Sequence, residues 1–129
     1  MKLVFWNCRG LGGKHKLEEI KILKHSESMS ILAIQGTKMQ TEDCIAVMKK
    51  IWKTGEGIAV SSQGASGGTV TWWDSNSFKI NSKTENHHCL FVELEDINSQ
   101  EIFWIGNVYG PTIHKQKDEF WTQVDNKKF

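Results

Sequence analysis

The chain has 129 residues, of which 39% are hydrophobic and 24% are charged, and its formal net charge is +1. This length fits one globular domain or part of one, and the composition excludes an intrinsically disordered chain. The even charge balance, with Arg9 as the single arginine, gives no separate indication of nucleic-acid or membrane binding.

The cysteines and the apolar runs bear on the compartment. Cys8, Cys44 and Cys89 are widely spaced and form no C-x-x-C pair, so neither a disulfide framework nor a zinc knuckle is indicated. The apolar run at the N-terminus is too short for a signal peptide, and no run reaches the roughly 18 residues of a membrane helix. We therefore expect a soluble intracellular protein, nuclear or cytoplasmic, with no membrane contact.

The first 35 residues predict a strand, a helix and a second strand. Residues 2–8 form a short apolar run that ends at the glycine-rich stretch 9–13, which is typical of a buried strand followed by a tight turn. Residues 15–25 place apolar side chains at a 3.6-residue period, which indicates an amphipathic helix. Residues 30–35 are again apolar, so the order predicts two parallel strands with a right-handed crossover.

A second helix and several strands are predicted after residue 40. Thr41, which precedes two acidic residues, is the expected N-cap of a helix whose apolar stripe continues to Trp52. Short β-rich runs then predict an antiparallel meander over residues 57–63, 68–73, 78–84, 89–94 and 102–109. Residues 115–127 predict a final helix. The tryptophans of the strands are expected to pack in the core: Trp6, Trp72, Trp73 and Trp104.

The glycine-rich stretch after the first strand does not match a nucleotide-binding motif. A Walker A loop would need glycine at the position of Cys8, and the dinucleotide fingerprint would need glycine at the position of His15. We interpret the stretch as a turn that requires a flexible backbone.

Three motifs together carry a family resemblance: WNCRGLG at 6–12, ILAIQGTKM at 31–39 and NVYGP at 107–111. With ASGGTVTWWD at 65–74, they occur in the order and spacing of the endonuclease/exonuclease/phosphatase superfamily. Within it, the chain most resembles the N-terminal endonuclease domain of plant LINE-type (non-LTR) retrotransposon proteins, which also carry a reverse transcriptase. The likeness covers residues 1 to about 121.

The resemblance implies an α+β fold: the N-terminal half of a four-layered α/β/β/α sandwich of the DNase I-like type, with mixed, mostly antiparallel sheets and flanking helices. It also implies a Mg²⁺-dependent hydrolase that cleaves DNA phosphodiester bonds. Asn7 would lie beside the metal and the scissile phosphate, and Tyr109 would hydrogen-bond the phosphate. Amide and phenol groups suit this role because they donate to phosphate oxygen without adding a mobile charge.

The second strand departs from the family at its end. Relatives read roughly LFIQETKM where this chain reads LAIQGTKM, so Gly36 occupies the position of the glutamate that binds Mg²⁺. Mg²⁺ is usually anchored by one or two carboxylates, and glycine offers no side-chain oxygen. Glu42 and Asp43 follow at a predicted helix start and are not expected to substitute. We expect no intact metal site.

Arg9 stands two residues after Asn7, where some apurinic-type relatives carry an aspartate ligand. The plant LINE-type sequences carry an arginine at this position, as this chain does. Its guanidinium group would bind a phosphate or pair with a neighbouring acidic residue, and the sequence favours neither.

The general base of the family comes from a later Asp-x-Asn motif, and an Asp-His pair assists it. Only twenty residues follow Tyr109, and Asp125 and Asn126 are adjacent instead of spaced by one. Hydrolysis needs a metal ligand, a base and donors for the developing charge, and only the donors have candidates here. We therefore expect residues 1–129 to form a single incomplete domain.

The resulting functional hypothesis is a fragment of a retrotransposon-type DNA endonuclease with impaired or no activity. The alternatives are a non-catalytic remnant that binds phosphate, DNA or a protein, and a gene fragment without selected function. If only the first sheet and its helices are present, the inner sheet face lacks its cover, and self-association through that face is expected.

Overall fold

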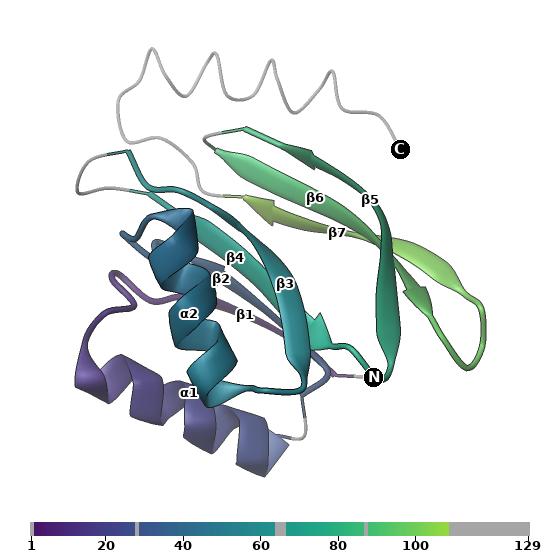
Figure 1. Cartoon of the computed structure of the whole chain (residues 1–129), viewed down its shortest axis with the longest axis horizontal. Coiled ribbons are helices and arrows are strands. Elements are labelled where there is room, and N and C mark those ends of the chain that lie inside the picture. Colours follow the sequence, from purple (N-terminus) through teal and green to yellow (C-terminus); the bar gives the residue numbers. More distant parts are fainter. Residues whose placement is uncertain (1, 28, 64–66, 87, 109–129) are drawn as a thin grey trace.

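The computed structural model describes residues 2–27, 29–63, 67–86 and 88–108 (Figure 1). The elements in chain order are β1 (Leu3–Asn7), α1 (Lys14–Glu27), β2 (Ile31–Gln35), α2 (Thr41–Ile51), β3 (Gly55–Val60), β4 (Thr69–Asp74), β5 (Phe78–Glu85), β6 (Cys89–Asp96) and β7 (Ile102–Val108). The predicted helix at 115–127 lies outside the described residues. No helix in the described ranges is long and apolar enough to cross a membrane.

The first sheet has the strand order β1-β2-β4-β3. β1 and β2 are parallel, with Leu3 opposite Ile31 and Asn7 opposite Gln35, as the strand–helix–strand order predicts. β4 runs antiparallel to both β2 and β3. The apolar residues of β2 are buried throughout, because this central strand is covered on both faces.

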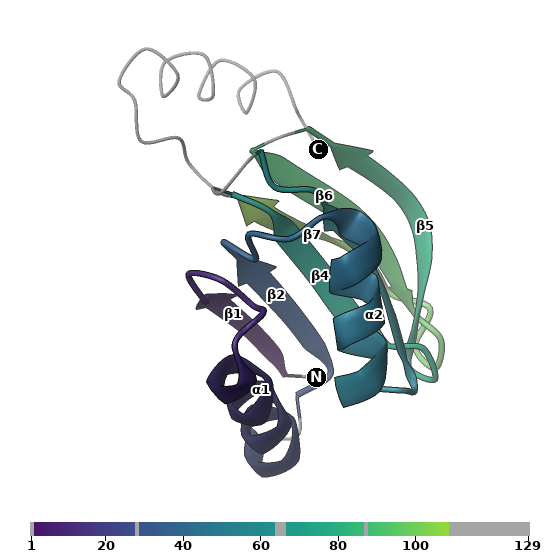
Figure 2. The same ribbon diagram turned by 60° about the vertical axis from the view of Figure 1, so that its left-hand side comes forward.

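The second sheet has the order β5-β6-β7, is antiparallel, and packs on the face of the first sheet that the helices leave free (Figures 1 and 2). The single meander predicted after residue 55 is therefore wrong. The hairpin of β3 and β4 completes the first sheet, and only β5, β6 and β7 form the second. The reason is that the edge of β2 carries unpaired backbone N–H and C=O groups. β4 forms hydrogen bonds with these groups before the chain continues into the second sheet.

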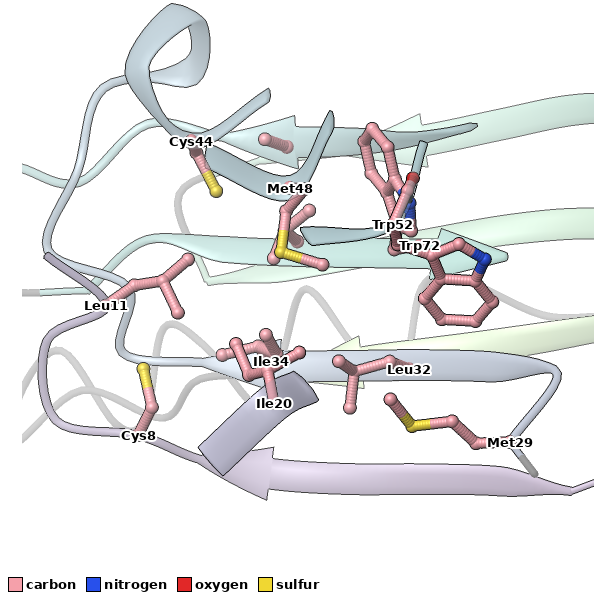
Figure 3. Packing of buried hydrophobic residues seen from close by; sticks show 12 residues of the cluster. Cys8, Leu11, Ile20, Met29, Leu32, Ile34, Cys44, Met48, Trp52 and Trp72 are labelled. Carbon is pink, nitrogen blue, oxygen red and sulfur yellow. Dashed lines mark hydrogen bonds between the residues drawn. The ribbon is translucent and has the colours of Figure 1, made fainter. Parts of the chain in front are cut away.

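Two hydrophobic clusters lie on the two faces of the first sheet. The helix-side cluster joins α1 and α2 to the sheet through residues such as Ile20, Met48 and Trp72 (Figure 3). The inter-sheet cluster includes Ile31 and Trp73 together with the inward residues of the second sheet. The adjacent indoles of β4 thus point to opposite faces, as the period of a strand requires.

Three sequence predictions need correction. The N-cap of α2 is Gln40, not Thr41, and the Gln40 side chain makes no capping hydrogen bond. The Thr41 hydroxyl is hydrogen-bonded to the Ser61 hydroxyl at 2.8 Å. Trp104 is 37% exposed on the outer face of β7, so it is not a core residue. The second sheet covers most of the inner face of the first sheet. The apolar surface that stays exposed on this face lies on β1, where Phe5 is 52% exposed.

Candidate functional site

Three strands end at one edge of the sandwich and bring the sequence motifs together (Figure 2). Asn7 ends β1 opposite Gln35, which ends β2. The Gln35 side chain then reaches the second sheet, where its amide donates a hydrogen bond of 2.8 Å to Asn107 Oδ1 near the end of β7. The ends of the WN and QG motifs and Asn107, the first residue of NVYGP, are therefore neighbours in space.

Asn107 ties the two sheets together at this edge. Its side chain is completely buried, and its amide nitrogen donates to the carbonyl oxygens of Ile34 at 3.2 Å and Val70 at 2.9 Å and to the Thr71 hydroxyl at 3.2 Å. Every polar atom of this buried side chain is thereby satisfied. The sequence analysis did not single out Asn107, although an asparagine inside an apolar strand is a signal of a buried polar contact.

Gly36 adopts a left-handed backbone conformation with φ of 74°. Its N–H donates to the Gly68 carbonyl at 2.8 Å, and its carbonyl accepts from the Gly10 N–H at 2.6 Å and from Cys8 Sγ at 3.4 Å. An L-residue with a side chain pays roughly 1–2 kcal/mol for this conformation. Glycine at position 36 thus fits the local backbone as well as removing a carboxylate.

The turn after Gly36 is clamped against the Gly67–Gly68 segment that leads into β4. The N–H groups of Thr37 and Lys38 donate to the carbonyls of Gly68 and Gly67 at 3.1 and 2.9 Å. Gly68 has a φ of 86°, and an added Cβ there would overlap with the Thr37 hydroxyl. That hydroxyl is buried, and the described structure gives it no hydrogen-bond partner. The turn is therefore packed so closely against Gly68 that position 68 has no room for a side chain.

The remaining predicted site residues differ in how they are placed. The Asn7 side chain is exposed at the strand edge. Arg9 is exposed, has a φ of 55° in the turn after β1, and forms no ion pair within the described part of the chain. Tyr109 lies outside the described residues, so its predicted contact stays a prediction.

Two cysteines lie under the edge, and both are unreactive in this setting. Burial raises the pKa of the Cys44 thiol to about 12, and the neighbouring Cys8 adds to the rise. Burial also raises the pKa of Cys8, although the Gly10 backbone and Lys16 partly oppose it. Burial thus disfavours the thiolate form of both side chains, which is the nucleophilic and metal-binding form.

The residues at this edge do not fit a Mg²⁺ site. Across the described ranges, no group of three or more His, Cys, Asp or Glu side chains could hold a metal ion. The Gly36 carbonyl already accepts hydrogen bonds from two donors, and the neighbouring Asn7 and Gln35 side chains offer amide oxygens but no carboxylate. A hard divalent cation would lack, among these residues, the carboxylate that usually anchors it.

No protein-family model matches the sequence, and neither does any curated protein. Solved structures do match. The AP endonuclease LMAP from Leishmania major is similar with a TM-score of 0.69 and 15% identity, over 96% of this chain and 45% of that one. An endonuclease/exonuclease/phosphatase family protein from Bacteroides thetaiotaomicron gives 0.71 and 13%, over 95% and 56%. The APE2 catalytic domain from Xenopus laevis gives 0.62 and 18%, over 95% and 49%.

These identities show a shared fold and no more. The fold prediction is confirmed: the chain is a mixed α+β structure with two stacked sheets, like its DNase I-like endonuclease/exonuclease/phosphatase neighbours. The chain spans about half the length of these structures, as a half of the full sandwich would.

Proposed function

We propose that this chain is the N-terminal half of a DNA phosphodiester-hydrolase domain of the plant LINE retrotransposon type, with its own nuclease activity lost or strongly reduced. On this proposal, residues 1–129 form one incomplete domain, and DNA is the ancestral substrate. The observation that carries the loss of activity is Gly36, which has a left-handed backbone and no carboxylate. It directly follows Gln35, the residue of β2 that lies opposite Asn7 and bonds to Asn107.

Several findings support the hydrolase origin. The neighbours in structure include an AP endonuclease, an endonuclease/exonuclease/phosphatase family protein and a TDP2 from D. rerio in complex with a single-strand DNA product. Asn7 of the WN motif, Gln35 of the QG motif and Asn107 of the NVYGP motif also meet at one strand edge, although they lie far apart in the sequence. The likeness to plant LINE sequences rests on these motifs alone.

We assign the phosphate contacts of the proposed ancestral site to Asn7, Tyr109 and Arg9. Asn7 is exposed at the edge, where its amide can donate a hydrogen bond to a phosphate oxygen. Arg9 follows in the turn, and its exposed guanidinium can bind phosphate through two parallel bonds. Without a metal ligand and a base, these donors bind phosphate and do not activate water.

A nicking assay on supercoiled plasmid with Mg²⁺ or Mn²⁺ tests this proposal. We expect no turnover above background, because the metal has no carboxylate anchor. The Asn7→Ala variant is compared with a matched control, Asn81→Ala, an exposed asparagine on β5 far from the edge. Cleavage that is lost in Asn7→Ala and retained in Asn81→Ala contradicts the proposal.

A second candidate function is non-catalytic binding of phosphate or DNA. The observation that favours it is the exposure of Asn7 and Arg9 at an otherwise rigid edge. Affinity for DNA that falls steeply with salt, without cleavage, and that weakens in Arg9→Ala supports this alternative. If the chain neither binds nor cleaves DNA, the results favour the inactive fragment.

We also propose that the chain associates with itself through the part of the inner sheet face that stays exposed. The exposed part of this face lies on β1, at Phe5, and pairing with another chain would remove this aromatic side chain from water.

A further inference from the structure

The two sheets are offset, so that β1 projects beyond the second sheet. β7 packs against β2 and β4, and β6 packs against β4. β1 lies on the far side of β2 and is the edge strand of the first sheet. The second sheet therefore ends above β2, and the sandwich has a step at this side (Figure 2).

The upper surface of the step is apolar. Phe5 is paired with Ala33 and lies on the same face as Leu3, which packs in the inter-sheet cluster. Phe5 thus points toward the layer of the second sheet but is 52% exposed. A large aromatic side chain on the inner face of a sandwich normally lies under a strand of the facing sheet.

Both strands that border the step have a free edge in the described structure. β1 pairs with β2 alone and β7 with β6 alone. A free edge presents unpaired N–H and C=O groups that can accept a strand from another chain. β1 and β7 also point the same way, since Asn7 and Asn107 both lie at the edge marked by Gln35.

We propose that two copies of this chain form a closed dimer about a twofold axis parallel to the strands, in which β1 of each copy pairs with β7 of the other. Rotation about such an axis exchanges the two layers and keeps the strand direction. It therefore brings the projecting β1 of one copy into the layer of the second sheet, beside the open edge of β7, in parallel orientation. The same contact forms twice.

In this arrangement both free edges are paired and the exposed face of β1 is covered. Each sheet combines the four strands of one copy with the three of the other. Phe5 of one copy then faces Phe5 of its partner between the layers, away from water. The helices lie on both outer surfaces, which gives an α/β/β/α sandwich. Its size agrees with the neighbours, whose chains are about twice as long as the matched region.

Neither of the other two edge pairings completes both sheets. If β7 paired with β7 about an axis normal to the sheets, β1 and β2 of both copies would enter the same space beneath the joint. If β1 paired with β1, the edge of β7 would stay open and Phe5 would have no facing strand. This inference rests on the fold and does not depend on the proposed hydrolase origin.

Sedimentation velocity of the full chain tests the stoichiometry. We expect a species with twice the mass of one chain. Phe5→Lys places two like charges against each other in the sealed layer and should weaken the dimer at least roughly 100-fold. Ile97→Lys, a matched change of an exposed apolar residue in the β6–β7 turn, should leave it intact. Circular dichroism checks that both variants remain folded.

A cross-linking measurement tests the geometry without a disruptive charge. The three native cysteines are buried, so Phe5→Cys adds the one accessible thiol among the described residues. Facing sheets lie about 10 Å apart, which is too far for a disulfide but within reach of a short bis-maleimide. We expect a covalent dimer from Phe5→Cys and none from Ile97→Cys, which lies far from the axis.

The proposal is overturned by a monomer at all accessible concentrations, by open-ended oligomers, or by a dimer that survives Phe5→Lys or fails to cross-link through position 5. None of these readouts involves DNA or metal. A failed nuclease hypothesis therefore leaves the dimer result unchanged, and a failed dimer leaves the nicking result unchanged.

Discussion

At the scale of single residues, Asn107 is the polar group on which the junction of the two sheets depends. It lies on β7, is fully buried, and forms hydrogen bonds with groups of two strands of the other sheet, β2 and β4. A buried amide with complete hydrogen bonding holds neighbouring elements in one register, because any shift leaves donors or acceptors unpaired.

We predict that Asn107→Ala lowers the free energy of unfolding by about 2–3 kcal/mol, since it leaves buried partners without a hydrogen bond. Urea denaturation measures this. The control is Asn81→Ala, whose side chain bonds to Glu95 on the exposed surface and should cost less than about 0.5 kcal/mol. Equal losses in the two variants would show that Asn107 has no special role at the junction.

Gly36 shows how much of the site the sequence could predict at this scale. The absence of a carboxylate follows from the residue type alone. The left-handed backbone and the clamp by Gly67 and Gly68 depend on segments about thirty residues apart, and only the folded chain brings them together. Asn107 was missed for the same reason, since its partners belong to strands that are distant in the sequence.

At the scale of elements, the contact between β3 and β4 depends on glycines that lie against an indole. A Cβ on Gly55 would overlap with the Trp72 ring, and a Cβ on Gly57 would overlap with the ring and with the Thr71 carbonyl. Trp72 is almost fully buried, and its Nε1 donates to the Trp52 carbonyl at 3.4 Å. The backbone of the edge strand β3 can therefore lie this close to the Trp72 ring only because both positions are glycine.

We predict that Gly57→Ala destabilises the chain by about 1–3 kcal/mol, because the methyl group has no space beside the Trp72 ring. Gly12→Ala is the control. Its Cβ would meet only the Met39 Cε atom at 3.9 Å, and a near-neutral change is expected. Thermal unfolding followed by tryptophan fluorescence compares the two. A neutral Gly57→Ala would refute the close approach.

The elements themselves were largely predictable. Hydrophobic period and glycine position indicated β1, α1, β2 and α2 and the parallel pairing of the first two strands. The N-cap of α2 was misplaced by one residue because the Thr41 hydroxyl turns to Ser61, a contact from β3's continuation that no local pattern contains. The exposure of Trp104 was also missed, since strand patterns do not show which face is covered.

At the scale of the whole molecule, the sandwich has two sheet layers where the sheets overlap. At the β1 step it has only the layer of the first sheet. The described residues place helices on one outer surface only (Figure 1). The edge that gathers the sequence motifs lies at the strand ends and carries no cluster of metal-binding side chains within the described ranges. A bound cation would thus find no group of anionic ligands among the described residues.

We predict that Mg²⁺ does not stabilise the folded chain. A ligand that binds the native state raises the midpoint of thermal unfolding in proportion to ln(1 + [L]/Kd), so a chain without a site shows no saturable rise. Differential scanning calorimetry with MgCl₂ is compared with NaCl at the same ionic strength. A saturable, Mg²⁺-specific increase would mean that the edge holds the ion by other ligands.

The sequence by itself determined the elements, the family-like motifs and the missing carboxylate at position 36, because these follow from residue types and short-range periodicity. Only the tertiary structure decided that the β-rich region divides between two sheets, that Asn107 joins them and that β1 projects past β7. These features depend on contacts between residues far apart in the chain, where the burial of one strand depends on which strand lies opposite it.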